Sequence, residues 1–398
     1  MNSVGMRLLD SLPSIRGLPL GRSLVLTAMA TLLVAADWLP ENGVVDPDHI
    51  ELWLAAGFSV SAIVLALRDR GHVVDVVAWR NRAILLSITL IILAIGGEFA
   101  TRFIFRDVTT SSDNGGYFSR RWYRTNAVHE NDAGFRGRPF TPVKPAGVYR
   151  IAVVGDSFTY GNGVRQEDRY SDVLQDRLPS HFEVLNFGMA GANTPEHHHR
   201  VEQLLRDVHP DFILLQWFVN DVEDDDTVGR PVFHPLVPFR ALHNWLNNAS
   251  ALYTVANMQW AETQATLGVT TSYGDYLKQR LGDPNSHDSV RDRELLRDTI
   301  AKAQQAHVPI GIVLFPDTAA PIDEHYPFAY LHDRVLDVCA ERSITCLDLR
   351  SDFAQVKDRQ TLWASRLDHH PSARANLIAA ERILETYSGV WAASPASK

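Results

Sequence analysis

Residues 149–161, with the sequence YRIAVVGDSFTYG, decide the fold of this chain. The apolar run 149–154 is typical of a strand buried in a sheet, and the glycine after it begins a turn. This turn places the hydroxyl of Ser157 at the carboxyl end of the strand, where open α/β sheets bind ligands. A Gly-Asp-Ser turn alone is weak evidence for catalysis, because a serine there often only caps a helix.

Short apolar runs alternate with longer amphipathic stretches after this turn. The alternation predicts an α/β fold with a parallel sheet covered by helices on both faces, over residues 149–390. The predicted strands are 149–154, 182–185, 212–217, 309–315 and 345–347. The predicted helices are 166–178, 195–208, 289–306, 330–341 and 372–387. Residues 229–288 do not follow the alternation and are interpreted as an insertion, whereas residues 106–148 are interpreted as a linker and lead-in segment.

Three uncharged apolar runs, 23–36, 52–67 and 83–97, lie near the amino terminus. Each is shorter than the ~20 residues that a membrane span requires, but interfacial residues such as Trp38 extend them. Three successive helices that are apolar on every side are unusual in a soluble domain. The sequence therefore predicts that residues 1–105 form a transmembrane anchor of about three helices that binds the lipid bilayer. Buried helices of a soluble domain, or a cleaved signal peptide over the first run, are the alternatives.

The charged loops between these runs predict the orientation of the anchor, because positively charged loops stay in the cytoplasm. The loop between the second and third runs contains Arg68, Arg70, Arg80 and Arg82, whereas the loop before it contains acidic charges and no Lys or Arg. The amino terminus is then cytoplasmic. Everything after the third span is extracytoplasmic, which makes the chain a multi-pass protein of the cell membrane.

Composition and local patterns argue against several other classes of function. The net charge of −9 provides no electrostatic basis for binding nucleic acid. Cys339 and Cys346 are too few for a four-cysteine metal site, and they are interpreted as two buried thiols, with a local disulfide as the alternative. The histidines at 197–199 are adjacent and do not share a helix face, so they are interpreted as solvated residues, not metal ligands. The acidic stretch 221–226 is interpreted as a solvated loop near the rim of the site that contains Ser157.

Four short segments resemble the sequence blocks of the GDSL/SGNH hydrolases, in the order that this family requires. These segments are GDSF at 155–158, NFGMAGANT at 186–194, FVND at 218–221 and DHHPS at 368–372. Each follows a predicted strand or precedes a predicted helix, and a chance match of all four is far less probable than a match of one. A lead-in, NDAGFRG at 131–137, also resembles some members of the family.

The resemblance implies a flavodoxin-like three-layer sandwich, the SGNH hydrolase fold, with a serine hydrolase site. Ser157 is the implied nucleophile, His370 is the base that takes its proton, and Asp368 orients the imidazole. The implied donors to the oxyanion are the backbone amides of Ser157 and Gly191 and the side chain of Asn220. No metal and no cofactor are implied.

Two departures from the family pattern concern the third and the last block. Phe218 stands where the third block usually begins with glycine, which affects the local backbone and the shape of the pocket. Only one residue separates Asp368 from His370, where two are usual, and His369 is therefore an alternative base.

The function that follows is serine-dependent hydrolysis of acyl esters through an acyl-enzyme. The predicted location outside the membrane, together with analogy to the family, suggests acetylated cell-envelope glycans as the substrate. An O-acyltransferase that modifies an extracytoplasmic polysaccharide is the first alternative, because it would use the same three residues. A non-catalytic glycan-binding module is the second alternative.

The orientation of the anchor can be tested with reporter fusions. A reporter fused after residue 398 is expected to be active only outside the cytoplasm, and one fused near residue 75 only inside it, because the arginines lie in the second loop. Cytoplasmic activity of the carboxyl-terminal fusion would show that the orientation or the number of spans is different.

Overall fold

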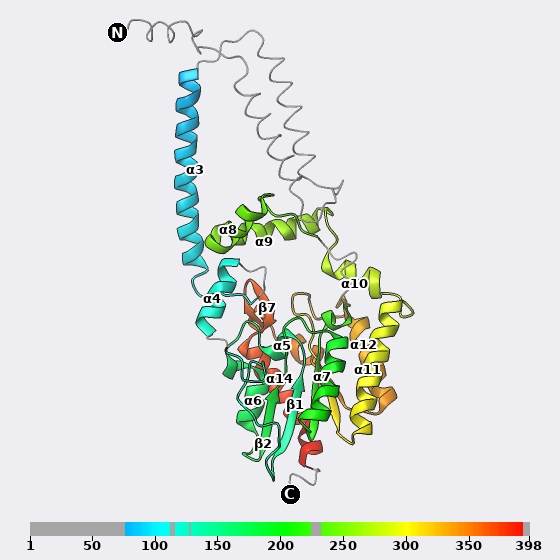
Figure 1. The fold of residues 1–398 in the computed structure, drawn as a ribbon. Coiled ribbons are helices and arrows are strands. Elements are labelled where there is room, and N and C mark those ends of the chain that lie inside the picture. The colour runs from blue at the N-terminus through cyan, green and yellow to red at the C-terminus, as the bar shows by residue number, and fades with distance from the viewer. Residues whose placement is uncertain (1–75, 112–115, 127–128, 224–231, 393–398) are drawn as a thin grey trace, which may run out of the picture. The chain divides into compact units, whose positions relative to one another are not determined.

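The computed structural model describes residues 76–111, 116–126, 129–223 and 232–392 (Figure 1). The chain divides into two compact units. One unit consists of residues 1–106 and 233–263, and the other of residues 107–232 and 264–398.

Five parallel strands form the central sheet of the larger unit, in the order β2-β1-β3-β4-β5. The strands are β1 (Tyr149–Val154), β2 (Phe182–Asn186), β3 (Phe212–Trp217), β4 (Ile310–Leu314) and β5 (Cys346–Asp348). This strand order is that of flavodoxin-like folds, in which the chain changes direction across the sheet beside the first strand. A separate antiparallel pair consists of β6 (Trp363–Ser365) and β7 (Asp368–Pro371).

Both faces of the sheet are buried, which explains why the strands are apolar without alternation. Ala152 and Val154 of β1 face one apolar cluster, while Ile151 and Val153 face the other, as the period of two in a strand requires. The predicted parallel sheet with helices on both faces is therefore confirmed.

The helices of the larger unit form a layer on each face of the sheet (Figure 1). The first apolar cluster joins the sheet to α7 (Thr194–Asp207), α10 (Tyr273–Leu281), α11 (His287–Gln305) and α12 (Ala329–Arg342). The second joins it to α6 (Tyr170–Arg177), α13 (Arg350–Ala354) and α14 (Ala373–Ala392). Two further helices, α4 (Gly116–Asn126) and α5 (Ser157–Tyr160), precede α6 in the chain.

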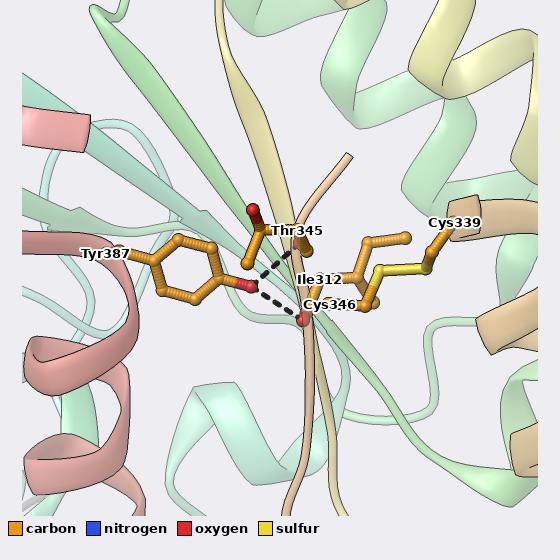
Figure 2. Close-up of a disulfide and its surroundings, with 5 residues drawn as sticks. All are labelled: Ile312, Cys339, Thr345, Cys346 and Tyr387. Atoms are coloured by element: carbon orange, nitrogen blue, oxygen red, sulfur yellow. Dashed lines mark hydrogen bonds between the residues drawn. A yellow bond between two sulfur atoms is a disulfide. The ribbon is translucent and has the colours of Figure 1, made fainter. Parts of the chain in front are cut away.

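A disulfide joins Cys339, near the end of α12, to Cys346 at the start of β5 (Figure 2). The Cα atoms of these residues are 6.2 Å apart. The preference for two free buried thiols is therefore wrong. The reason is that α12 turns back after Ser343, in a left-handed conformation with φ of 54°, and brings the two cysteines together. Beside the disulfide, the Tyr387 hydroxyl donates to the carbonyl oxygens of Ile312 (2.9 Å) and Thr345 (3.0 Å) and so fastens α14 to the edge of the sheet.

The smaller unit contains α3 (Val76–Ile104), α8 (Arg240–Ala249) and most of α9 (Ala251–Thr266). Among the described residues, one helix is long and apolar enough to cross a membrane, over Arg80–Ile104, and its most apolar window contains no buried residue. It contains the third apolar run. The first two runs lie outside the described residues, so the multi-helix anchor stays a prediction.

Glu98 is the one acidic residue of α3 and receives several hydrogen bonds. Its carboxylate accepts from the Ser250 hydroxyl (2.7 Å) and from the backbone N–H groups of Ala251 and Leu252 (both 3.0 Å). Arg102, one turn later, donates to it at 2.6 Å. These bonds satisfy the free amides at the start of α9, and they compensate a charge that would be costly in an apolar helix.

Candidate active site

The turn between β1 and α5 holds Ser157 through hydrogen bonds and through close packing against neighbouring side chains. Asp156 caps α5 by accepting from the N–H of Phe158 at 2.8 Å. Gln216 of β3 accepts from the Asp156 N–H (3.1 Å) and from the Thr159 hydroxyl (2.8 Å). A Cβ atom at position 155 would lie 2.1 Å from the hydroxyl oxygen of Thr159. Only glycine therefore fits before Asp156, and the turn presents Ser157 at the carboxyl end of β1.

The structure brings Ser157, His370 and Asp368 together in a hydrogen-bonded chain. His370 Nε2 lies 2.9 Å from the Ser157 hydroxyl oxygen, and His370 Nδ1 lies 2.6 Å from Asp368 Oδ1. With the proton assigned to Nδ1, the ring donates to the carboxylate and its Nε2 accepts from the serine. This arrangement can remove the serine proton while the charge on the imidazole is stabilised.

The extended backbone of β7 explains how Asp368 and His370 can work together with only one residue between them. Side chains at positions i and i+2 of a strand point to the same face, so Asp368 and His370 lie side by side. His369 points to the opposite face, where its ring centroid lies 4.4 Å from that of Trp363. The histidine next to Ser157 is thus His370, not the alternative base His369.

Burial and the neighbouring charge have opposite effects on the pKa values of Asp368 and His370. Burial alone would raise the pKa of the Asp368 carboxyl, but hydrogen bonds from His370 and Ser111 hold it well below its usual value. Burial also opposes the charged form of His370, yet the hydrogen bond and the charge of Asp368 outweigh it and raise the pKa of His370. Asp368 is therefore ionised at neutral pH and stabilises a proton on the imidazole.

The three predicted oxyanion donors follow three neighbouring strands of the sheet. Ser157 begins α5 after β1, and Asn220 lies in the short helix η3 (Val219–Val222) after β3. Gly191 lies in the turn after β2 with φ of +82°, a conformation that favours glycine. Because parallel strands end at one edge, β2-β1-β3 bring these residues to the same end of the sheet.

Phe218 packs beside the site. The centroid of its ring lies 4.2 Å from that of Phe158, which in turn lies 5.5 Å from the His370 ring. The bulky residue in the place of the usual glycine therefore belongs to an aromatic cluster that reaches the histidine. Its backbone N–H donates to Asp221 at 2.9 Å.

Two expectations for the surroundings of the site are wrong. His197 is buried instead of solvated, and burial lowers its pKa to about 3. Asp221 is fully buried as well, and burial together with the charge of Asp156 raises its pKa well above its usual value. The two side chains lie close together in the interior, with His197 Nδ1 3.7 Å from Asp221 Oδ2. Residues 224–226 lie outside the described residues.

Residues 131–137, interpreted as a lead-in, brace the loop that follows Ser157. The side chain of Arg136 is buried, and it donates to the carbonyl oxygens of Gly161 (2.5 Å) and Val164 (2.9 Å). Arg169 donates to the Arg136 carbonyl oxygen at 2.5 Å. Burial, followed by the charge of Arg169, lowers the pKa of Arg136 to about 10, so its guanidinium stays charged at neutral pH.

Sequence reasoning missed Ser111, which lies in the segment interpreted as a linker. Its backbone N–H and its hydroxyl donate to Asp368 Oδ2 at 2.6 and 2.8 Å. The two residues are 257 positions apart, and no local pattern marks a single serine in a region of irregular structure. Within the described residues, no group of three or more His, Cys, Asp or Glu side chains is arranged to hold a metal ion.

One comparison with known proteins identifies a family. A family model described as the GDSL-like Lipase/Acylhydrolase family matches residues 153–377. A structure of TesA is similar to this chain, with 14% sequence identity and a TM-score of 0.38. The match covers 61% of this chain and 99% of the TesA chain. No curated protein matches this chain.

Two acetylxylan esterase structures are also similar to this chain. One, AlAXEase, has 19% identity and a TM-score of 0.37, with 59% of this chain and 98% of that chain covered. The other is a catalytic mutant from Geobacillus stearothermophilus, with 17% identity and a TM-score of 0.38, and the match covers 63% of this chain and 100% of that chain.

The raised pKa of His370 predicts the pH dependence of activity. Only the neutral imidazole accepts the serine proton, so kcat/KM should fall as the pH drops through the pKa of His370. Because Asp368 raises this pKa, the fall should begin at a higher pH than for an ordinary histidine. A pH profile with an aryl acetate measures this limb. A midpoint at or below the ordinary value for histidine would contradict the assignment.

Proposed function

We propose that this chain, which belongs to the GDSL-like Lipase/Acylhydrolase family, cleaves acyl esters through an acyl-enzyme on Ser157. Membership makes it an enzyme of the esterase and acylhydrolase class. The observation that carries the assignment of residues is the 2.9 Å approach of His370 Nε2 to the Ser157 hydroxyl, with Asp368 behind the ring.

In the proposed first step, Ser157 attacks the ester carbonyl while its proton passes to His370 Nε2. The carbonyl oxygen becomes an oxyanion, which the N–H groups of Ser157 and Gly191 and the amide of Asn220 stabilise. The tetrahedral intermediate collapses, the imidazolium gives its proton to the leaving alcohol, and the acyl group remains on Ser157. In the second step, His370 removes a proton from water, which attacks the acyl-enzyme. The bond between the acyl group and the Ser157 oxygen then breaks, His370 returns the proton to that oxygen, and the acid is released.

We further propose that the substrate is an acetylated glycan of the cell envelope. The helix α3 is long and apolar enough to span a membrane, which supports attachment to the membrane. The disulfide between Cys339 and Cys346 is of a kind that persists in oxidising compartments, which supports an extracytoplasmic location. Outside the membrane, the esters within reach of a tethered enzyme include those of surface polysaccharides.

The nucleophile and the acyl acceptor can be tested together. Replacing Ser157→Ala should lower hydrolysis of 4-nitrophenyl acetate at least about a thousandfold and leave the melting temperature unchanged, because the other residues cannot replace the nucleophile. Retention of more than about a tenth of the activity would contradict the nucleophile assignment.

To identify the acyl acceptor, wild-type enzyme is incubated with an acetyl donor and a deacetylated polysaccharide. Acetylation of the polysaccharide would identify an O-acyltransferase, whereas release of acetate alone supports the hydrolase.

The role of Asn220 is tested by replacing Asn220→Ala. A donor that acts on the oxyanion works mainly in the transition state, so kcat should fall about 100- to 1,000-fold with little change in KM. Phe218→Gly is the companion variant, and it should alter the preference between acetyl and longer acyl esters without abolishing catalysis. An Asn220→Ala enzyme with normal kcat would exclude this residue from the oxyanion hole.

A further inference from the structure

We propose that Ser111 is a positioning residue that holds the carboxylate of Asp368 in the orientation in which it pairs with His370. This inference rests on the proposed function, since it assigns to Ser111 a task within that group of three residues. Ser111 touches neither the substrate nor the serine nucleophile in this proposal. Its hydroxyl oxygen also lies 3.4 Å from His370 Nδ1, but that nitrogen makes the much shorter contact of 2.6 Å with Asp368, so the proposed action of Ser111 runs through Asp368.

The two oxygens of Asp368 are shared between two partners. Oδ1 accepts from the backbone N–H of His370 at 3.1 Å and from its Nδ1 at 2.6 Å. Oδ2 accepts from the N–H and the hydroxyl of Ser111 at 2.6 and 2.8 Å. The final torsion of an aspartate side chain is broad, so contacts on one oxygen alone restrain it poorly. Donors on both oxygens fix the plane of the carboxylate, and with it the direction in which Oδ1 faces the imidazole.

Burial makes these donors necessary. Asp368 is only 3% exposed, and a buried carboxylate is costly unless each oxygen receives hydrogen bonds. Both donors of His370 go to Oδ1, which leaves Oδ2 to other partners. Ser111, itself 3% exposed, supplies two donors to the other oxygen from a single residue.

The segment that contains Ser111 is held in place by a second contact. The hydroxyl of Ser365, in β6, donates to the carbonyl oxygen of Thr109. Thr110, which lies between Thr109 and Ser111 in the chain, is fully buried. Residues 109–111 are thus seated at the β6–β7 pair, the element that carries Asp368 and His370. In sequence, this segment begins five residues after the last residue of α3, Ile104. The stretch that links the apolar helix to the catalytic unit is therefore itself part of the site.

The central test is Ser111→Ala in the full-length chain in detergent, assayed with 4-nitrophenyl acetate. Loss of a hydrogen bond to a charged group should lower kcat by about 10- to 100-fold, with KM unchanged. The acid limb of the pH profile should also move to lower pH, because looser pairing with Asp368 no longer raises the pKa of His370 as far. A structural role alone would reduce activity by the same factor at every pH.

Two further variants separate hydrogen bonding from packing. Ser111→Cys fills nearly the same space but is a much weaker donor, so it should lose activity as Ser111→Ala does. If Ser111→Cys keeps wild-type kcat, packing explains the effect and the proposal is wrong. Ser119→Ala is the matched control, because Ser119 is a buried serine of α4 outside the site, and it should keep wild-type kcat and the wild-type pH profile.

A double-mutant cycle with Asp368→Ala decides whether Ser111 acts through Asp368. Once the carboxylate is gone, Ser111→Ala should cause no further loss of kcat. An equal loss in both backgrounds, or a folded Ser111→Ala enzyme within twofold of wild type, would overturn the proposal. Failure of the proposed function can be told apart from failure of the Ser111 proposal. If the proposed function is wrong, Ser157→Ala and Asp368→Ala would be as active as wild type.

Discussion

The hydrogen bond between Ser157 and His370 is the interaction on which the rest of the site depends. It joins residues that are 213 positions apart, and it forms only when the end of β1 and the strand β7 meet. The first side of this contact is set by the tight turn after β1, where Gly155 leaves no room for a side chain. The second side is set by the extended backbone of β7, which places Asp368 and His370 on one face.

Buried polar groups around this contact form a compensated network. Arg136 satisfies two carbonyl oxygens in the loop after Ser157, and Arg169 in turn donates to the backbone of Arg136. Asp368 receives donors on both oxygens. Groups of this kind are costly to bury singly, so each becomes stable only when its partners are in place. Such mutual dependence keeps the reacting atoms in one arrangement, which is what a preorganised site requires.

The parts of the site that sequence reasoning located share one property: their residue types and their order form local patterns. Strands such as 149–154 and 212–217 were predicted with their observed bounds, because burial on both faces makes the whole run apolar. Ser157 and His370 stand in short blocks at strand ends, and such blocks are visible without any knowledge of the fold. The bounds of α6 and α14 differed by several residues, since amphipathic patterns end less sharply than apolar strands.

The sequence by itself therefore determined the α/β class, the five strands of the central sheet, most of the helices that cover it, and the short blocks around Ser157, Asn220 and His370. The β6–β7 pair and the helices α10 and α13 were not among the predicted elements. Only the tertiary structure decided which distant groups are partners. It paired Ser111 with Asp368 and Glu98 with the start of α9, it joined the two cysteines, and it buried His197. The physical reason is that a hydrogen bond or a burial depends on distance in space. A lone serine or histidine has the same sequence neighbours whether it is buried or solvated, so its partners become known only when the chain is folded.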